Sequence, residues 1–283
     1  MSDQHQVSGV LNPLFSLLAG RTIESDGSRA QVGFDITDDW LQGRTAYGGL
    51  TSALGAQAMR ELSAPMPAGA SLRALQTSFV GPVGAGPVSV EAVLLRDGKS
   101  VRQIQASLRQ AGQVCAVMLG VFAKDRASTM RSVHPQRPAA THAAETMALQ
   151  PYVEGAMPRF LRHFDLRWDD GPQPGSGGTG MATRIHMRMH DAEGLSNELM
   201  TVMMADVSPT PATGQFRWPA PASSVSWALE LRPLRRPIDA TGWWRADNES
   251  LVVDGGYVNH AARLWAPTGE LAALAYQVVS IYG

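Results

Sequence analysis

The chain has 283 residues, which is enough for one large domain or two of ordinary size. Only 17% of its residues are charged and the formal net charge is -1, which excludes a basic nucleic-acid footprint and a polybasic membrane anchor. A single cysteine, Cys115, excludes an internal disulfide framework and a cysteine-rich metal site. The polar start, Met1 to Gln6, lacks a signal-peptide pattern, and no apolar run nears the roughly 20 residues of a membrane span. We therefore expect a soluble cytoplasmic protein.

The first predicted elements are a short helix and a strand. An apolar stripe at helical spacing runs from Val7 to Leu18, and Pro13 in its middle favours a short helix that starts near this proline. Residues 29–38 alternate between apolar and polar side chains, which predicts a strand.

The stretch from Ala46 to Leu62 organises the first half of the chain. It has no charge until Arg60, its apolar residues recur at helical spacing, and small residues fill the rest. A helix without a charged face has to be buried. Small side chains let a sheet approach the backbone closely, although Gly55 costs about 1 kcal/mol of helix propensity. We expect a core helix wrapped by an antiparallel sheet, and a helix start at Gly48 and Gly49 that leaves backbone N–H groups free.

A run of strands and then a linker follow this helix. Alternating apolar residues, separated by turn signals such as Asp97-Gly98, predict strands at 71–80, 87–96, 100–109 and 113–123. Residues 126–158 are rich in Ala, Pro, His and Arg and have weak periodicity, with a short helix predicted near 143–147. A helix followed by an antiparallel meander indicates an α+β fold.

The second half of the chain repeats this order. A loop rich in Gly, Pro and Ser at 171–180 separates two strand patterns, and the predicted elements are strands at 160–168 and 182–189, a helix at 195–207, and strands at 223–231, 243–253, 257–265 and 271–282. Aligned without gaps, Asp97-Gly98 falls on Asp254-Gly255 and Gly112 falls on Gly269, between strands of the same apolar phase. We therefore predict two copies of one helix-plus-sheet module.

The two copies differ at positions that bear on chemistry. Gly120 of the first copy falls on Gln277 of the second, and Asp206 continues the apolar face of the second helix without a counterpart in the first. An amide or a carboxylate in such a setting needs a partner or, for the acid, a shifted pKa. Two interpretations are open for each residue: a functional group kept in the second copy, or a side chain turned to solvent. Asp206 can also cap the turn at Ser208.

Several other signals indicate structure more than chemistry. The Gly-rich run 175–180 resembles a phosphate loop but lacks its Lys-Ser/Thr ending. The histidines show no metal-ligand spacing, and no Gly-x-Ser-x-Gly motif is present. Cys115 lies within a strand pattern and is predicted to be a core residue. Serines at strand ends usually satisfy turns, so Ser223, Ser224 and Ser226 carry little weight by themselves.

Specific motifs resemble those of the double hotdog acyl-CoA thioesterases of the acyl-CoA thioesterase II type. The motifs are Tyr47-Gly48-Gly49, Phe79-Val80-Gly81-Pro82, the run from Arg96 to Gly112, and, in the second half, Leu264-Trp265 with Gly269-Glu270-Leu271 and Gln277. The resemblance covers roughly residues 23–283. It implies an α+β double hotdog, and we predict an N-terminal hotdog at 1–125, a linker at 126–158 and a C-terminal hotdog at 159–283.

The resemblance also implies a catalytic trio of an acid, a hydroxyl and an amide in the second module. Asp206 matches the acid and Gln277 matches the amide. Ser223 is our choice for the hydroxyl because it stands ten residues before Pro233, while Ser224 and Ser226 lie close to it. Such a trio would activate a water that attacks a thioester carbonyl. No metal, other cofactor or covalent intermediate is required.

The remaining expectations concern substrate and partners. Gly48 and Gly49, with Tyr47 beside them, are expected to bind an acyl-CoA substrate, and an acyl tunnel is expected between the modules, where the Met cluster at 200–204 either lines it or forms plain core. Hotdog folds also serve hydratases, which carry a His-Asp pair near the central helix, but neither predicted helix contains a histidine. Exposed sheet edges would favour self-association into a homo-oligomer.

Two other classes of function compete with hydrolysis of an acyl-CoA to a free fatty acid and coenzyme A. The alternative is a non-catalytic acyl-CoA or acyl-group binding protein with a degenerate hotdog site, and a plain interaction scaffold is the third. Convergence of Asp206, Ser223 and Gln277 around one water would distinguish the enzyme from both.

Overall fold

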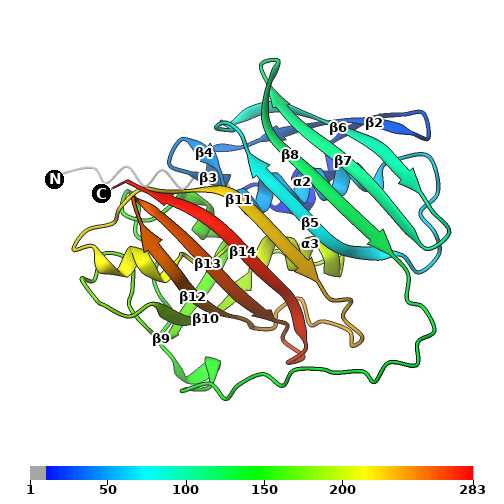
Figure 1. Cartoon of the computed structure of the whole chain (residues 1–283). Helices are drawn as coiled ribbons and strands as arrows, with labels where there is room; N and C mark the ends of the chain where they lie inside the picture. The colour runs from blue at the N-terminus through cyan, green and yellow to red at the C-terminus, as the bar shows by residue number, and fades with distance from the viewer. Residues whose placement is uncertain (1–10, 283) are drawn as a thin grey trace.

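One antiparallel sheet of twelve strands forms the body of the molecule (Figure 1). The computed structural model describes residues 11–282. The polar start at Met1 to Gln6 and the first part of the apolar stripe, residues 7–10, lie outside these residues.

The helices are α1 (Leu14–Ala19), α2 (Gly48–Arg60) and α3 (Asn197–Met204), with 3-10 turns η1 (Asp38–Trp40), η2 (Ala144–Thr146), η3 (Arg159–His163) and η4 (Pro211–Gln215). The strands are β1 (Thr22–Ser25), β2 (Arg29–Ile36), β3 (Leu41–Gln42), β4 (Thr45–Ala46), β5 (Ser71–Phe79), β6 (Gly86–Asp97), β7 (Val101–Gln110), β8 (Gln113–Ala123), β9 (Phe164–Asp170), β10 (Ala182–Met189), β11 (Ala222–Leu231), β12 (Trp244–Asp254), β13 (Tyr257–Trp265) and β14 (Leu271–Ile281).

The predicted elements are present with a few differences at their ends. The helix α1 begins directly after Pro13, as expected for a residue without a backbone N–H. The helix α3 is shorter than the predicted 195–207, because Ser196 caps its start and the chain leaves the helix at Ala205. Asp206 therefore lies just beyond the helix and does not continue its face, which corrects the sequence prediction. The strand predicted from residue 160 begins at Phe164, after the 3-10 turn η3 that Pro158 opens.

The helix α2 is buried in the concave side of the sheet, as its composition predicts. Most of its residues are buried, Leu50 and Leu54 completely. A Cβ placed on Gly55 would lie 2.1 Å from Sδ of Met118, a residue of β8. The small side chains of α2 therefore do allow the close approach of the sheet.

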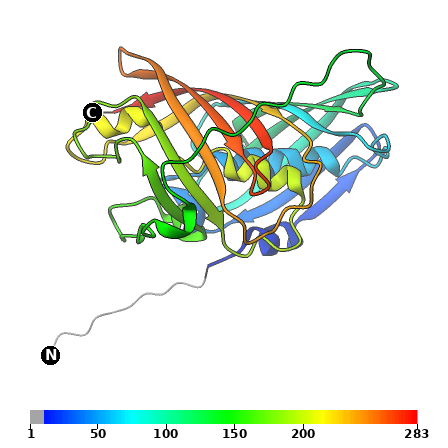
Figure 2. The ribbon, with the colours of Figure 1, turned by 90° about the horizontal axis from the view of Figure 1, so that it is seen from below.

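The predicted internal repeat is confirmed by the strand order. On one side of the junction the order is β6-β7-β8-β5, and on the other it is β11-β14-β13-β12, so equivalent strands occur in reversed order about the β5–β11 pair. Each module carries a β-bulge at the equivalent place, beside Arg73 in β5 and beside Val225 in β11. Figure 2 shows α2 and α3 side by side beneath the joined sheet. This is the double hotdog architecture expected from the resemblance.

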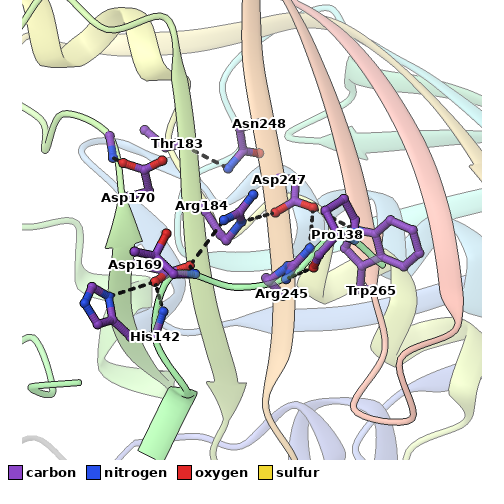
Figure 3. A network of polar contacts seen from close by, with 12 residues as sticks. Pro138, His142, Asp169, Asp170, Thr183, Arg184, Arg245, Asp247, Asn248 and Trp265 are labelled. Carbon is purple, nitrogen blue, oxygen red and sulfur yellow. Dashed lines mark hydrogen bonds and ion pairs between the residues drawn. The ribbon is translucent and has the colours of Figure 1, made fainter. Parts of the chain in front are cut away.

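The predicted linker, 126–158, contains one 3-10 turn and is bound to the second module by buried charged groups (Figure 3). The carboxylate of Asp169 accepts the backbone N–H groups of Thr141 and His142 at 3.0 and 2.8 Å. Arg245, which is almost fully buried, donates to the carbonyl of Pro138 at 2.8 Å. The middle of the linker is thus held on the strands. The domain boundaries at 125 and 158 stay predictions.

An alternating set of ion pairs connects the residues that hold the linker. Arg184 lies between two carboxylates, 3.6 Å from Asp169 and 3.0 Å from Asp247. Asp247 also pairs with Arg245 at 2.8 Å and accepts a hydrogen bond from the indole of Trp265. Each buried charge in the network therefore has an opposite charge beside it, which is the condition under which burial of charge is tolerated.

Within residues 11–282, no helix has the length and apolar character needed to cross a membrane.

Candidate active site

Asp206 and Gln277 meet at the junction of the two modules. The amide Nε2 of Gln277, on β14, donates to Oδ1 of Asp206 at 2.6 Å. The backbone N–H of Gly49, in the first turn of α2, donates to the same carboxylate. Because α2 belongs to the first module and Gln277 to the second, neither module contains this arrangement alone. The two residues selected from the sequence are thus brought together.

The surroundings of Asp206 raise the pKa of its carboxyl toward neutral pH. Burial raises the pKa of Asp206 from 3.8 to about 6, although the donors Gln277 and Gly49 oppose the shift. Desolvation disfavours the charged form, while hydrogen bonds to the carboxylate favour it. Asp206 is thus mostly ionised at pH 7 and still close to its pKa. A base in that range is well matched to proton transfer at neutral pH.

The glycines at the start of α2 make room for this carboxylate. A Cβ on Gly48 would lie 2.8 Å from Oδ2 of Asp206 and 3.1 Å from the ring of Phe79. Gly49 approaches Asp206 through its backbone N–H. The pair predicted to bind substrate through the backbone therefore lies at the site. In the structure the N–H of Gly49 already serves Asp206.

Tyr47 fixes the position of α2 relative to α3. It is completely buried, its hydroxyl donates to the carbonyl of Met203, and its ring stacks on Phe160 with centroids 4.2 Å apart. Burial, together with the nearby charge of Asp206, raises the pKa of Tyr47 well above 10.0. Because Tyr47 has no exposed surface, a direct contact of its side chain with substrate stays a prediction.

The structure does not bring Ser223 to Asp206 and Gln277. Ser223 is exposed and pairs with Ser280, whereas the residue directly opposite Gln277 on β11 is Trp227. Four residues of strand separate Ser223 from Trp227, about 13 Å. The neighbouring candidates are closer in register but are not opposite Gln277 either, since Ser224 pairs with Val279 and Ser226 with Val278. The role of Ser223 as the hydroxyl of a trio stays a prediction.

Two residues that the sequence did not single out lie on either side of Gln277. Trp227 of β11 and His260 of β13 are each directly opposite it, so the three side chains share the inner face of the sheet. Trp227 and His260 are buried, and neither Nε1 of Trp227 nor Nδ1 of His260 has a hydrogen-bond partner among the described residues. Burial lowers the pKa of His260 to about 4, so its ring is neutral at pH 7.

In the first module, the position equivalent to Gln277 has no room for a side chain. Gly120 stands where the second module has Gln277, and a Cβ there would lie 2.4 Å from Sδ of Met59. A glutamine side chain at Gly120 would displace this methionine. The difference between the copies that the sequence indicated therefore corresponds to a polar site in one module and a packed one in the other.

Cys115 and the Gly-rich loop have structural roles. Cys115 is buried in β8, as predicted for a core residue. The Gly-rich loop packs on the segment between η4 and β11, where a Cβ on Gly175 would lie 3.0 Å from the backbone of Trp218. Within the part of the chain that the structure describes, no three His, Cys, Asp or Glu side chains are grouped to hold a metal ion.

A surface groove of about 460 Å³ lies at the module junction, on the side of the sheet away from α2. Its lining includes the exposed side chains of Gln76, Ser78 and Tyr276. These residues alternate along their strands with Thr77 and Gln277, which face α2 and Asp206. The lining also includes Trp227, His260 and Gln277, so the groove reaches the strand segments that carry the candidate site.

Comparison with known proteins points to one family. The model of an acyl-CoA thioesterase N-terminal domain matches residues 36–123, and that of an acyl-CoA thioesterase C-terminal domain matches residues 134–281. No curated protein matches the chain.

Similar solved structures support the fold. A conserved protein of unknown function with a hot dog fold from Alicyclobacillus acidocaldarius is 18% identical, with 96% of this chain and 99% of that chain covered and a TM-score of 0.77. A putative thioesterase II from Thermobifida fusca is 17% identical, with coverages of 93% and 96% and a TM-score of 0.75. An acyl-CoA thioesterase II from Mycobacterium marinum is 17% identical, with coverages of 92% and 96% and a TM-score of 0.69.

Proposed function

Because the chain belongs to the acyl-CoA thioesterase family, we propose that it hydrolyses an acyl-CoA to a free fatty acid and coenzyme A, with Asp206 as the general base. The observation that carries this proposal is the 2.6 Å hydrogen bond from Gln277 to Asp206 at the start of α2. It places a carboxylate with a pKa of about 6 between the two modules. Family membership supports thioester hydrolysis in general, and the geometry supports the assignment of these residues.

The proposed reaction is a single displacement by water. The carboxylate of Asp206 takes a proton from a water as the water oxygen attacks the thioester carbon. The carbon–sulfur bond then breaks, and the proton on Asp206 passes to the leaving sulfur, which yields coenzyme A and the acid. Gln277 and the N–H of Gly49 hold the carboxylate in place. Because they favour its ionised form, they keep the base available at neutral pH.

The experiment is hydrolysis of an acyl-CoA panel from acetyl to palmitoyl, followed by release of free thiol. We expect Asp206→Asn to lower turnover about 10²- to 10⁴-fold, the usual contribution of general base catalysis. The matched control is Asp254→Asn, an exposed acid in the β12–β13 turn, which should keep the parent rate. Parent-like turnover by Asp206→Asn would move the base elsewhere. No turnover by the parent on any member of the panel would favour the non-catalytic acyl-binding protein.

A second variant tests the hydroxyl of the predicted trio. If Asp206 and Gln277 act without Ser223, as its exposed position and pairing with Ser280 indicate, Ser223→Ala should keep turnover within a few-fold of the parent. A loss comparable to that of Asp206→Asn would instead require β11 to bring Ser223 to the substrate.

A further inference from the structure

Trp227 lies on the inner face of the sheet between two residues that are anchored to the candidate site. On one side it pairs with Gln277, which binds Asp206. On the other side it pairs with Thr77, whose hydroxyl lies 3.1 Å from that of Ser52. Ser52 is about one helical turn beyond Gly48 on α2. The register thus places Trp227 in one cross-strand row with Gln277 and Thr77, on the inner face of the sheet.

The indole N–H of Trp227 is buried without an acceptor. The residue is 1% exposed, and Nε1 has no hydrogen-bond partner among the described residues. This nitrogen can only donate, and a buried donor left unpaired costs about 1–3 kcal/mol. The polar residues on either side of it, Thr77 and Gln277, both have partners, whereas Nδ1 of His260, beyond Gln277 in the same row, has none among the described residues. A donor kept unpaired next to Gln277, the residue that binds Asp206, indicates an acceptor that arrives from outside.

Thioester hydrolysis requires such a donor. When water attacks, the carbonyl π electrons move to oxygen, and the resulting oxyanion needs hydrogen bonds that are already in place. The N–H of Gly49 and one of the two N–H groups of the Gln277 amide are engaged with Asp206, so Gly49 is not free for this task and Gln277 is held in the position that serves the carboxylate. We propose that Nε1–H of Trp227 donates to the substrate carbonyl oxygen and stabilises the oxyanion, which makes Trp227 a catalytic residue. This inference rests on the proposed thioesterase function.

The electron and proton balance follows from the mechanism above. The new bond joins the water oxygen to the carbonyl carbon, and the water proton goes to Asp206. The oxyanion held by Trp227 then re-forms the C=O bond and expels the sulfur, which takes the proton from Asp206. Trp227 donates a hydrogen bond throughout and transfers no proton.

A substrate can reach Nε1 of Trp227 only if neighbouring side chains move. The helix α3, which packs against β11, carries side chains that can do so. They are three buried methionines, Met200, Met203 and Met204. Methionine is unbranched and adapts to changes of shape in a core. Substrate entry can therefore repack this helix face while the strands stay in place.

Trp244 supplies a matched control. It is also fully buried with an unpartnered Nε1, but it lies six residues along β12 from Ser250. Ser250 belongs to the same cross-strand row as Trp227 and Gln277 through His260, so Trp244 is about 20 Å away along the strand. An unpaired indole alone does not mark a site, and only Trp227 combines it with a place next to Gln277.

The experiment compares steady-state hydrolysis by the full-length parent and three variants. They are Trp227→Phe, Trp244→Phe, and a protein with 3-benzothienylalanine incorporated at position 227, which keeps the shape of the indole but has no N–H. For both position 227 variants we expect kcat to fall about 10²- to 10³-fold, the loss typical of one oxyanion donor. KM should change little, the pH–rate profile should keep its midpoint, and Trp244→Phe should retain parent kcat.

The benzothienyl protein keeps the inference testable if Trp227→Phe does not fold. A kcat within threefold of the parent for the benzothienyl protein would overturn the inference while leaving the proposed function intact. An equal loss in Trp244→Phe would overturn it too, because the effect would then be one of packing. Absence of turnover by the parent on every acyl-CoA would instead remove the proposed function, and this inference with it.

Discussion

Asp206 should destabilise the folded protein at neutral pH, and Asp206→Asn should reveal how much. Folding raises the pKa of Asp206 from 3.8 to about 6, so the folded state holds the proton more tightly than the unfolded state. The ionised carboxyl therefore opposes folding. The penalty is absent below about pH 4, grows between pH 4 and 6, and is complete above pH 6. At 1.36 kcal/mol per pKa unit, the difference between 3.8 and about 6 corresponds to about 3 kcal/mol of unfolding free energy.

Asparagine has a similar shape and no charge to desolvate at any of these pH values. Its one side-chain oxygen can still accept from Gln277. We thus expect Asp206→Asn to be more stable than the parent by up to about 3 kcal/mol at pH 7.5 and to show no such gain at pH 3.5. The variant would lose activity while it gains stability, as is common for residues held in an unfavourable state for function.

The assay is urea unfolding of both proteins at pH 3.5 and 7.5, followed by far-UV circular dichroism, with the slope m compared to exclude a change in the unfolded state. The exposed Asp254→Asn serves as the reference for an acid-to-amide change outside the core. A variant no more stable than the parent at pH 7.5, or a gain of equal size at both pH values, would refute the link between burial of Asp206 and its raised pKa.

Three further predictions follow from the same contacts. Because the base must be ionised, kcat/KM should rise with pH through about 6 and level off above it, and initial rates from pH 4.5 to 8.5 check this; a flat profile contradicts it. Gly48→Ala places a Cβ 2.8 Å from Oδ2 of Asp206 and should lower kcat about 10²-fold through misplacement, whereas Gly55→Ala, which meets the flexible end of Met118, should keep turnover. Asp169→Asn removes the charge that accepts the N–H groups of Thr141 and His142 and leaves Arg184 with Asp247 alone, which should cost about 3 kcal/mol of unfolding free energy, with faster proteolysis of residues 126–158; an unchanged urea midpoint would contradict a role of Asp169 in holding the linker.

The elements were predictable where local pattern and global fold agree. The uncharged, small-residue helix at the start of the first module could only be buried, and α2 is buried. The turns at Asp97-Gly98 and Asp254-Gly255 allowed the internal repeat to be identified from the sequence, because such dipeptides specify hairpins through local sequence alone. Asp206 and Gln277 could be selected because each is a polar residue in an apolar setting that the other copy lacks.

The neighbours of Gln277 could not be predicted, because they depend on bulges. Counting back from the β13–β14 turn pairs Trp265 with Leu271, and continuing without interruption would place His260 opposite Tyr276. A bulge beside Trp265 shifts the register by one residue, so His260 lies opposite Gln277 and on the inner face. A second bulge, at Val225, sets which residue of β11 faces Gln277. Neither bulge has a signature in the sequence, so the sequence could not show which residue of β11 lies opposite Gln277, and the choice of Ser223 as the hydroxyl stays a prediction.

The pseudo-symmetry of the fold creates two helix-end junctions, and the chain uses them differently. At one, the start of α2 meets the end of α3, and Gly49 donates to Asp206. At the other, the start of α3 meets the end of α2, and Glu198 pairs with Arg60 at 2.5 Å while accepting the backbone N–H of Leu72. The second junction has its charge satisfied by an ion pair that joins the modules, so its groups are committed to structure. The first keeps a carboxylate bound only by neutral donors, and that carboxylate remains available to take a proton.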